Sequence, residues 1–509
     1  MQLKLQALKN KNYSKIALLF LFICLSHISL GFDFKIIYAI SVFFLFLSIN
    51  AIRPLYTLLI ILLALISAMY LPVAMLYGEP NFNIATSLLY TNKIESLEFA
   101  SNIPYYYYLL SVAILALGFY LSRYQFKVKL TWKLVFVSLF LIIFLQGAFK
   151  SWSKEDEFSL ANTGLPEVKF LKQSVQAIIS SLSEKKKMDE MLKHQDDYPL
   201  LESHSNYDTY VLVIGESVRK DFMHSYGFEI ANTPFLDNLK GKIFTNYISA
   251  APATVPSLTN TIAEYSKLQN NIVTLSNKAN IHTYWLSNQG AIGENDSPIA
   301  SIGKRANQSI FIKNGDYTSA EPDYKLLPYI NDAINEGKGT KKLIIVHLIG
   351  SHTPACKRTE NKYDLFYLSN RVSCYVQSIK NTDELLHSVY DALKASNTKW
   401  SMMYFSDHGV SFSNKENRSK LDLIHGYSHK QNFEAPFFIA SYDDQETEVI
   451  DARISGFDFL PLFTEWLGID HYQNPNCKMI SNQNCKFNNR VLGFDNTLMN
   501  FDLLPDDSL

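Results

Sequence analysis

The sequence of 509 residues has no excess of charge of either sign and few charged residues. Lysine and arginine number 47, aspartate and glutamate 48, and together they make up 19% of the chain. A general nucleic-acid binder needs a basic surface to displace counterions from phosphates, so the charge balance argues against that class. The sequence also lacks Gly/Pro-rich or low-complexity blocks, and its apolar content of 48% is too high for a disordered chain. A chain of this length must divide into parts.

Apolar residues crowd into the first 150 positions. Five runs there are long enough, or nearly so, to cross a ~30 Å hydrocarbon core as helices of roughly 17–25 residues. These runs are 16–32, 36–52, 55–76, 105–121 and 130–149. A bundle of buried soluble helices is the alternative, and five runs almost without internal charge make it the poorer explanation. The sequence therefore predicts a five-helix transmembrane domain over residues 1–150.

The loops between the runs set the orientation, because lysine and arginine favour the cytoplasmic side. Most of the lysines and arginines near the apolar runs lie on one side, before the first run, after the second run and between the fourth and fifth runs. They are Lys4, Lys9, Lys11, Lys15, Arg53, Arg123, Lys127, Lys129 and Lys133. The other short loops hold only Lys35 and Lys93. The amino terminus is thus predicted to be cytoplasmic, and an odd number of crossings places the rest of the chain outside.

The five cysteines agree with an exported location. Cys24 lies in the first run, whereas Cys356 with Cys374 and Cys477 with Cys485 form two close pairs further on. An oxidising compartment favours two local disulfides. Zinc binding by the four thiolates is the alternative, but spacings of 18 and 8 residues fit no zinc-finger pattern.

A linker is predicted over residues 151–205. It contains an apolar pattern at helical spacing, formed by Val168, Leu171, Val175, Ile178, Ile179 and Leu182. Such a pattern indicates an amphipathic helix lying on the outer membrane surface. A helix packed on the domain that follows explains the pattern equally well.

Residues 206–509 alternate short β-type runs with helical stretches, which is typical of a mainly parallel sheet flanked by helices. Strands are predicted at 210–214, 282–286, 343–348, 400–405 and 436–440. Four of the five end in polar or metal-binding residues. These are Glu216 and Ser217; Ser287, Asn288 and Gln289; Ser351 and His352; and Ser406, Asp407 and His408. In open α/β sheets the ligand lies beyond the carboxyl ends of the strands, so these residues are expected to converge on one pocket.

The chemistry of this set points to a metal. Glu216, Asp407 and His408 offer the mixture of oxygen and nitrogen ligands that suits zinc. A metal-bound hydroxyl is a nucleophile near pH 7. Thr254, within SAAPATVPSL at 249–258, precedes a predicted helix whose amino-terminal amides favour a phosphate. Each residue also has a structural explanation. Glu216 is then a capping acid, Thr254 an N-cap, and His408 a loop histidine held by hydrogen bonds. Their clustering at successive strand ends favours a site.

Several segments resemble the motifs of the bacterial phosphoethanolamine transferases of the alkaline phosphatase and sulfatase superfamily. The segments are VIGESVRKDFMHSYGF at 213–228, NTPFLD at 232–237, WLSNQ at 285–289, HLIGSH at 347–352, YVQSIKNTD at 375–383, YFSDHG at 404–409, IHG at 424–426 and APFF at 435–438. A five-span anchor also belongs to this family. The resemblance covers essentially the whole chain, and the ordered series is more specific than any single motif.

The resemblance implies that Glu216, Thr254, Asp407 and His408 hold zinc, one ion or two, and that Thr254 is the nucleophile. It places His352 and His425 at the donor phosphate or a second zinc, with His347 and Asn288 as further candidates there. His429 competes with His425 for its position, and Thr259 and Thr261 are rivals of Thr254. The sequence departs from the family pattern at Val410, where many relatives have an acidic residue, and it lacks a Cys-Gly-Thr lead before Thr254.

The implied reaction moves phosphoethanolamine from phosphatidylethanolamine to an envelope glycan or glycolipid, namely lipid A, the lipopolysaccharide core or a periplasmic glucan. The implied location is the bacterial inner membrane with the catalytic domain in the periplasm. Transfer of glycerol phosphate and sulfatase-like hydrolysis are the alternatives within the superfamily, although no Cys/Ser-x-Pro-x-Arg segment is present at 250–260. A noncatalytic membrane protein that binds lipid or a partner is the alternative from another class.

Overall fold

A computed structural model describes residues 2–90, 93–155, 163–290, 297–312, 321–337, 340–472, 477–481, 485, 487–493 and 496–509. The predicted linker therefore lies partly outside the described residues. The chain divides into two compact units. One comprises residues 1–89 and 99–182, and the other comprises residues 90–98 and 183–509.

The first unit is helical. Its helices are α1 (Gln2–Ser29), α2 (Ile36–Ile49), α3 (Arg53–Tyr77), α4 (Phe82–Tyr90), α6 (Tyr105–Ser122) and α7 (Leu130–Glu155), with α5 (Lys93–Asn102) divided between the units. All five predicted apolar runs are helical. Within the described residues, α3 and α6 are long and apolar enough to cross a membrane, and 13–29, 36–49 and 130–146 form shorter apolar helices. Five crossings therefore stay a prediction.

Helix α8 (Pro166–Lys193) contains the predicted amphipathic stretch. Five residues of its apolar stripe, Leu171, Val175, Ile178, Ile179 and Leu182, are between 48% and 61% exposed. Another face contacts the first unit, where the Phe170 ring packs on Tyr70 and the Ser181 hydroxyl donates to the Phe82 carbonyl. Later in the same helix, Met188, Met191 and Leu192 pack against the core of the second unit. The stripe itself is thus not covered by the other described residues of the first unit.

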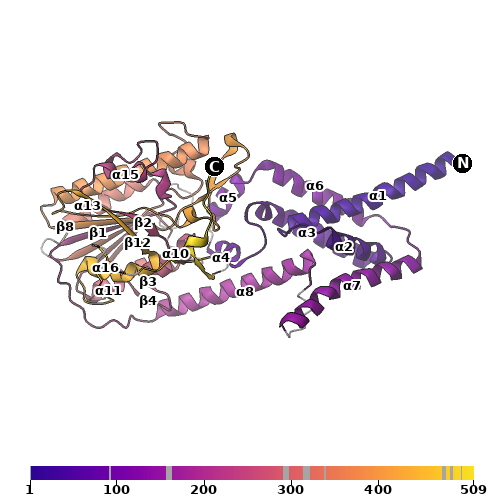
Figure 1. The fold of residues 1–509 in the computed structure, drawn as a ribbon, viewed down its shortest axis with the longest axis horizontal. Coiled ribbons are helices and arrows are strands. Elements are labelled where there is room, and N and C mark those ends of the chain that lie inside the picture. Colours follow the sequence, from indigo (N-terminus) through magenta and orange to yellow (C-terminus); the bar gives the residue numbers. More distant parts are fainter. Residues whose placement is uncertain are drawn as a thin grey trace. The chain divides into compact units, whose positions relative to one another are not determined.

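The second unit is an α/β domain built on an eight-stranded sheet (Figure 1). Its spatial order is β12-β2-β11-β8-β1-β7-β5-β6, and the strands from β8 to β6 run parallel. Only β11 runs antiparallel to its neighbours. The strands are β1 (Thr209–Gly215), β2 (Gly241–Ile248), β5 (His282–Ser287), β6 (Gln308–Phe311), β7 (Lys342–His347), β8 (Trp400–Ser406), β11 (Phe437–Ser441) and β12 (Thr447–Ser455). The predicted mainly parallel α/β architecture is confirmed.

Short antiparallel pairs and helices complete this unit. The paired strands are β3 (Ala263–Glu264) with β4 (Lys267–Asn271), β9 (Ser411–Ser413) with β10 (Asp422–Ile424), and β13 (Arg490–Leu492) with β14 (Leu498–Asn500). The helices are α9 (Pro234–Asp237), α10 (Thr254–Thr261), α11 (Ile272–Lys278), α12 (Pro298–Gly303), α13 (Leu327–Asn335), α14 (Ala355–Arg358), α15 (Asn370–Ala395) and α16 (Phe459–Leu467).

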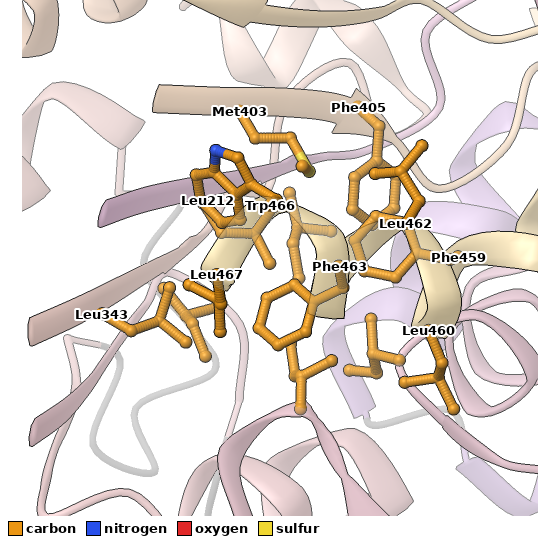
Figure 2. Packing of buried hydrophobic residues seen from close by; sticks show 14 of the residues in the cluster. Leu212, Leu343, Met403, Phe405, Phe459, Leu460, Leu462, Phe463, Trp466 and Leu467 are labelled. Atoms are coloured by element: carbon orange, nitrogen blue, oxygen red, sulfur yellow. The ribbon is translucent and has the colours of Figure 1, made fainter. Parts of the chain in front are cut away.

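Strand β1 is buried along its whole length and feeds two cores. Because side chains alternate across a strand, Tyr210, Leu212 and Ile214 join one core, while Val211 and Val213 join the other. Helices α13 and α15 cover one face of the sheet, and α11 and α16 the other (Figure 1). Figure 2 shows the side chains of α16 packed against Leu212, Met403 and Phe405. This double burial fixes the central strands whose carboxyl ends carry the predicted site.

Candidate active site

Two metal-ligand candidates follow neighbouring strands. Strands β1 and β8 pair in parallel, with Gly215 opposite Ser406, so the next residues, Glu216 and Asp407, emerge side by side. The sheet continues this arrangement at β7, after which the backbone N–H of Ser351 donates to the Glu216 carbonyl. Gly350 has a φ of +47° and lies so close that a Cβ there would meet the Glu216 backbone at 2.9 Å. The end of the sheet therefore gathers three of the predicted strand ends around Glu216.

Thr254 is the first residue of α10, with Ala253 at the N-cap position. Its hydroxyl donates to Glu216 Oε2 at 2.9 Å and lies 3.4 Å from His408 Nε2. The helix is tied to the same site at its first turn, because the Ser257 hydroxyl donates to the Asp407 carbonyl at 2.5 Å. The hydroxyls of Thr259 and Thr261 instead donate to carbonyls of their own helix. The nucleophile candidate that faces the carboxylates is thus Thr254.

Glu216, Asp407 and His408 offer ligand atoms that all lie within 4.8 Å of one another, and all three residues are buried. His408 Nε2 lies 3.4 Å from Glu216 Oε1 and 3.5 Å from Asp407 Oδ2. The other ring nitrogen of His408, Nδ1, lies 2.8 Å from the Gly409 carbonyl, which orients the ring. This is the arrangement by which a carbonyl fixes the tautomer of a metal-binding histidine.

A second ligand group shares Glu216 and adds His352 and His425, again within 4.8 Å. The His425 ring lies 5.0 Å from the His408 ring and 5.4 Å from the His352 ring. His429 is not a member of either group, and its Nδ1 lies 3.2 Å from the Ser428 hydroxyl. Of the two histidines left open by the sequence, His425 is the one beside the site.

Glu216, Asp407 and His408 strongly shift one another's pKa values. Burial raises the pKa of Asp407 well above its ordinary value, and the Glu216 charge adds to this effect. Burial acts in the same direction on Glu216, but the hydrogen bond and charge of His408 hold the pKa of Glu216 well below its ordinary value. Burial lowers the pKa of His408, yet the two carboxylates bring it to about 9. Glu216 and His408 thus favour each other's charged forms.

A divalent cation fits this donor set. Asp407 Oδ2 is buried and has no hydrogen-bond partner among the described residues. The same holds for Nδ1 of His425, whose pKa is lowered to about 3 by burial and by the charges of His408 and His352. Unpaired buried acceptors are costly unless a proton or a cation meets them. Two carboxylates with neutral imidazoles are the ligands that zinc takes in catalytic sites.

His347 and Asn288 lie at neighbouring strand ends but in neither ligand group. The His347 ring packs against Trp285, and its Nδ1 lies 3.4 Å from the Ser287 hydroxyl. The Asn288 amide donates to the Glu321 carbonyl and to Asp323 Oδ1. Within the described residues, these contacts give Asn288 a role in holding the 321–323 segment.

Several contacts that hold the site were not predicted from the sequence. Ser217 contacts both carboxylates: its N–H donates to Asp407 Oδ1 at 3.0 Å and its hydroxyl to Glu216 Oε1 at 2.6 Å. Ser217 was predicted at this strand end together with Glu216, but its contacts with the two carboxylates were not. Arg219 is buried and pairs with Asp221 and Asp507, and it also reaches the Val410 carbonyl. Nothing in the sequence around Asp507 pointed to this contact.

Both predicted disulfides are present, Cys356–Cys374 and Cys477–Cys485. The first connects α14 to α15 and so closes the loop that begins just after His352. Arg358 in the same loop donates through Nε to the His352 carbonyl. The covalent link therefore restrains the segment that follows a site histidine.

Comparison with known proteins agrees with this geometry. The chain matches the Sulfatase family over residues 208–469. It is 36% identical over 465 residues to the phosphoethanolamine transferase OpgE of Escherichia coli strain K12, which covers 89% of this chain and 88% of that protein. The chain belongs to the phosphoethanolamine transferase family. A putative phosphoethanolamine transferase of Haemophilus influenzae is 34% identical, covering 68% of this chain and 72% of its own.

Two solved phosphoethanolamine transferases share the fold. The integral membrane protein EptA of Neisseria meningitidis aligns with a TM-score of 0.58 at 17% identity, covering 90% of this chain and 97% of that one. The periplasmic domain of Escherichia coli EptC, solved as a complex with Zn, aligns with a TM-score of 0.54 at 19% identity, covering 61% and 98%. The alkaline phosphatase-like fold of the second unit is therefore that of other phosphoethanolamine transferases.

Proposed function

We propose that this chain transfers phosphoethanolamine from phosphatidylethanolamine to a glycan or glycolipid of the cell envelope, through a covalent phospho-threonine at Thr254. One observation carries the proposal. The Thr254 hydroxyl lies within hydrogen-bond distance of Glu216 and 3.4 Å from His408, at the edge of a donor set suited to zinc. Membership of the phosphoethanolamine transferase family supports the substrate class.

Glu216, Thr254, Asp407 and His408 would hold zinc, and Glu216 with His352 and His425 would hold a second ion. When bound, zinc makes the Thr254 hydroxyl more acidic and neutralises charge on the phosphoryl oxygens. The zinc in the related EptC domain supports this assignment. His347 and Asn288 lie at neighbouring strand ends outside both ligand groups and receive no role in the reaction.

The residues of the chain account for both halves of the reaction. In the first, Thr254 Oγ attacks phosphorus, the bond to the diacylglycerol oxygen breaks, and that oxygen takes up the proton that the hydroxyl loses. Phosphoethanolamine is then an ester of Thr254. In the second, an acceptor oxygen attacks phosphorus, the bond between phosphorus and Thr254 Oγ breaks, and the proton that the acceptor loses restores the Thr254 hydroxyl. With one ion bound, His352 and His425 would exchange these protons, whereas with a second ion they would be its ligands.

A lipid donor explains why the catalytic domain has a membrane anchor. We propose that the five apolar helices cross the inner membrane with the amino terminus in the cytoplasm, which leaves residues 206–509 in the periplasm. Two disulfides in the second unit suit that oxidising compartment. The exposed stripe of α8 suits a helix that lies on the bilayer surface.

Substitution of Thr254 tests the reaction. Thr254→Ala in the full-length purified protein is expected to abolish transfer from labelled phosphatidylethanolamine, and wild-type protein is expected to carry a phosphoethanolamine mass on the peptide containing Thr254. Thr259→Ala is the matched control, because its hydroxyl bonds only within α10 among the described residues and its loss leaves Thr254 in place. Headgroup transfer by the Thr254→Ala protein would refute the nucleophile.

Labelled phosphatidylglycerol distinguishes the glycerol-phosphate alternative, and release of free phosphoethanolamine without an acceptor would indicate a hydrolase. The acceptor is identified by mass spectrometry of envelope glycans from cells with and without the intact protein. The expected difference is the mass of one headgroup on lipid A, lipopolysaccharide core or periplasmic glucan.

A further inference from the structure

Ser217 holds the two carboxylates of the candidate metal site together. Its backbone N–H bonds to Asp407 and its hydroxyl bonds to Glu216, so one residue orients both. Ser217 has a φ of +61°, in the left-handed region that residues with a Cβ seldom adopt. A residue keeps such a conformation only when its surroundings enforce it.

The enforcing contact comes from Tyr375 on α15. Its hydroxyl donates to the Ser217 carbonyl at 2.7 Å and accepts from the Arg219 N–H at 2.9 Å. A phenol hydroxyl has one proton to donate and lone pairs to accept, and here it uses both functions on one short turn. Tyr375 is 1% exposed, so water does not replace these bonds. The turn that follows Glu216 is thus closed by a hydroxyl from an element 156 residues away in sequence.

We infer that Tyr375 is a positioning residue for the metal site: its hydroxyl keeps Ser217 in the left-handed conformation that aligns Glu216 and Asp407. This inference rests on the proposed metal site and extends it to a residue that contacts neither carboxylate among the described hydrogen bonds. Without the hydroxyl, the turn relaxes, and the two carboxylates no longer share their common donor. The consequence is weaker metal binding.

Tyr375 also fills space in the core, where its ring lies 5.4 Å from the Phe222 ring. A test must therefore separate packing from positioning. Tyr375→Phe keeps the ring and removes only the hydroxyl. The chain offers a closely matched control in Tyr226, whose buried hydroxyl likewise donates to one backbone carbonyl and accepts from one backbone N–H, both of Phe437 and both at 3.0 Å. Phe437 is not a neighbour in sequence of any candidate ligand.

The experiment compares wild type, Tyr375→Phe and Tyr226→Phe as full-length protein in detergent. Each is stripped of metal with a chelator, and its zinc affinity is measured by competition with a chromophoric chelator. Both variants are expected to lower the melting temperature of the metal-free protein by similar amounts. Only Tyr375→Phe is expected to weaken zinc binding, by roughly 10–100-fold as for other residues that orient metal ligands.

Equal zinc affinity in the two variants would overturn the role of Tyr375 while leaving the proposed function intact. Failure of wild type to bind zinc would overturn both. If Tyr375→Phe does not fold, Ser217→Ala asks the same question, since it removes the hydroxyl bond to Glu216 and retains the backbone N–H that bonds to Asp407. Undiminished zinc affinity in Ser217→Ala would likewise refute the inference.

Discussion

The Arg219 guanidinium and the Asp507 carboxylate form a buried ion pair at 2.7 Å, although 288 positions separate them in sequence. Asp507 also accepts from the Phe412 N–H, and Arg219 reaches the Val410 carbonyl. The pair thus connects the segment after Glu216 with the segment after His408. Position 410, where many relatives have an acidic residue, is a valine here. Asp507 supplies a carboxylate to Arg219, which contacts the Val410 carbonyl.

Loss of this pair is expected to destabilise the fold. Asp507→Ala leaves Arg219 buried with Asp221 as its remaining partner, and breaking a buried pair in this way costs roughly 3 kcal/mol. Equilibrium unfolding in denaturant, followed by intrinsic fluorescence, measures the effect. Asp506→Ala is the control, because that side chain is exposed and makes only surface contacts among the described residues, with Gln431 at 3.2 Å and Lys430 at 3.8 Å. Equal unfolding free energies for the two variants would contradict the importance of the pair.

Removal of metal is expected to abolish activity and to lower stability. Zinc at 100 times its dissociation constant adds about 2.7 kcal/mol to the free energy of unfolding. The melting temperature and the transfer rate should therefore fall together on chelation and recover together when zinc is returned. Elemental analysis of the purified protein distinguishes one ion from two. A fully active preparation without metal would exclude the zinc-dependent reaction.

Acid is expected to destabilise the metal-free protein through His347. Burial lowers the pKa of His347 from 6.5 to about 4, so the folded protein holds this imidazole neutral where the unfolded chain protonates it. The stability gained from a neutral His347 is complete above pH 6.5 and is lost as pH falls toward 4, by roughly 3 kcal/mol in total.

The measurement compares wild type with His347→Asn, both stripped of metal, in unfolding experiments between pH 4 and pH 7. The free energy of unfolding of wild type should fall more steeply with acid than that of the variant, whose side chain does not titrate. Parallel pH profiles would show that another group causes the loss.

The exposed stripe of α8 is expected to contact lipid. A single cysteine at Ile179, labelled with an environment-sensitive fluorophore in a Cys24→Ser background, should report an apolar surrounding in nanodiscs and should be quenched by a lipid-soluble quencher. The same label at Lys186, whose side chain is 79% exposed, is the control and should respond to a water-soluble quencher. The reverse pattern at position 179 would exclude an interfacial helix.

The central sheet was predictable because its strands are continuous apolar runs. The five predicted strands correspond to β1, β5, β7, β8 and β11, with ends shifted by at most one residue. Strands β6 and β12 were not predicted because they lie at the two edges, where one face or one end is exposed and no apolar run is required. Strand β2 was missed for a similar reason, since Lys242 and Asn246 interrupt its apolar residues.

Glu216, Asp407 and His408 became candidates because they follow apolar strands directly. The contacts that hold these side chains in place were not predictable from the sequence. Ser217 adopts its conformation through Tyr375, and Arg219 is neutralised by Asp507, and both partners approach only in the folded chain. A single tyrosine inside an amphipathic helix, or an aspartate in a polar stretch, carries no periodic signal that distinguishes it from its neighbours.

The pairing of β1 with β8 has a consequence for how such an enzyme diversifies. Glu216 and Asp407 are separated by the spacing between two adjacent strands, about 4.8 Å, which backbone hydrogen bonds maintain. Loops that border the pocket can lengthen or change composition without altering that separation. Under the proposed reaction, changes in these loops would alter the choice of acceptor while the positions of Glu216 and Asp407 stay constant.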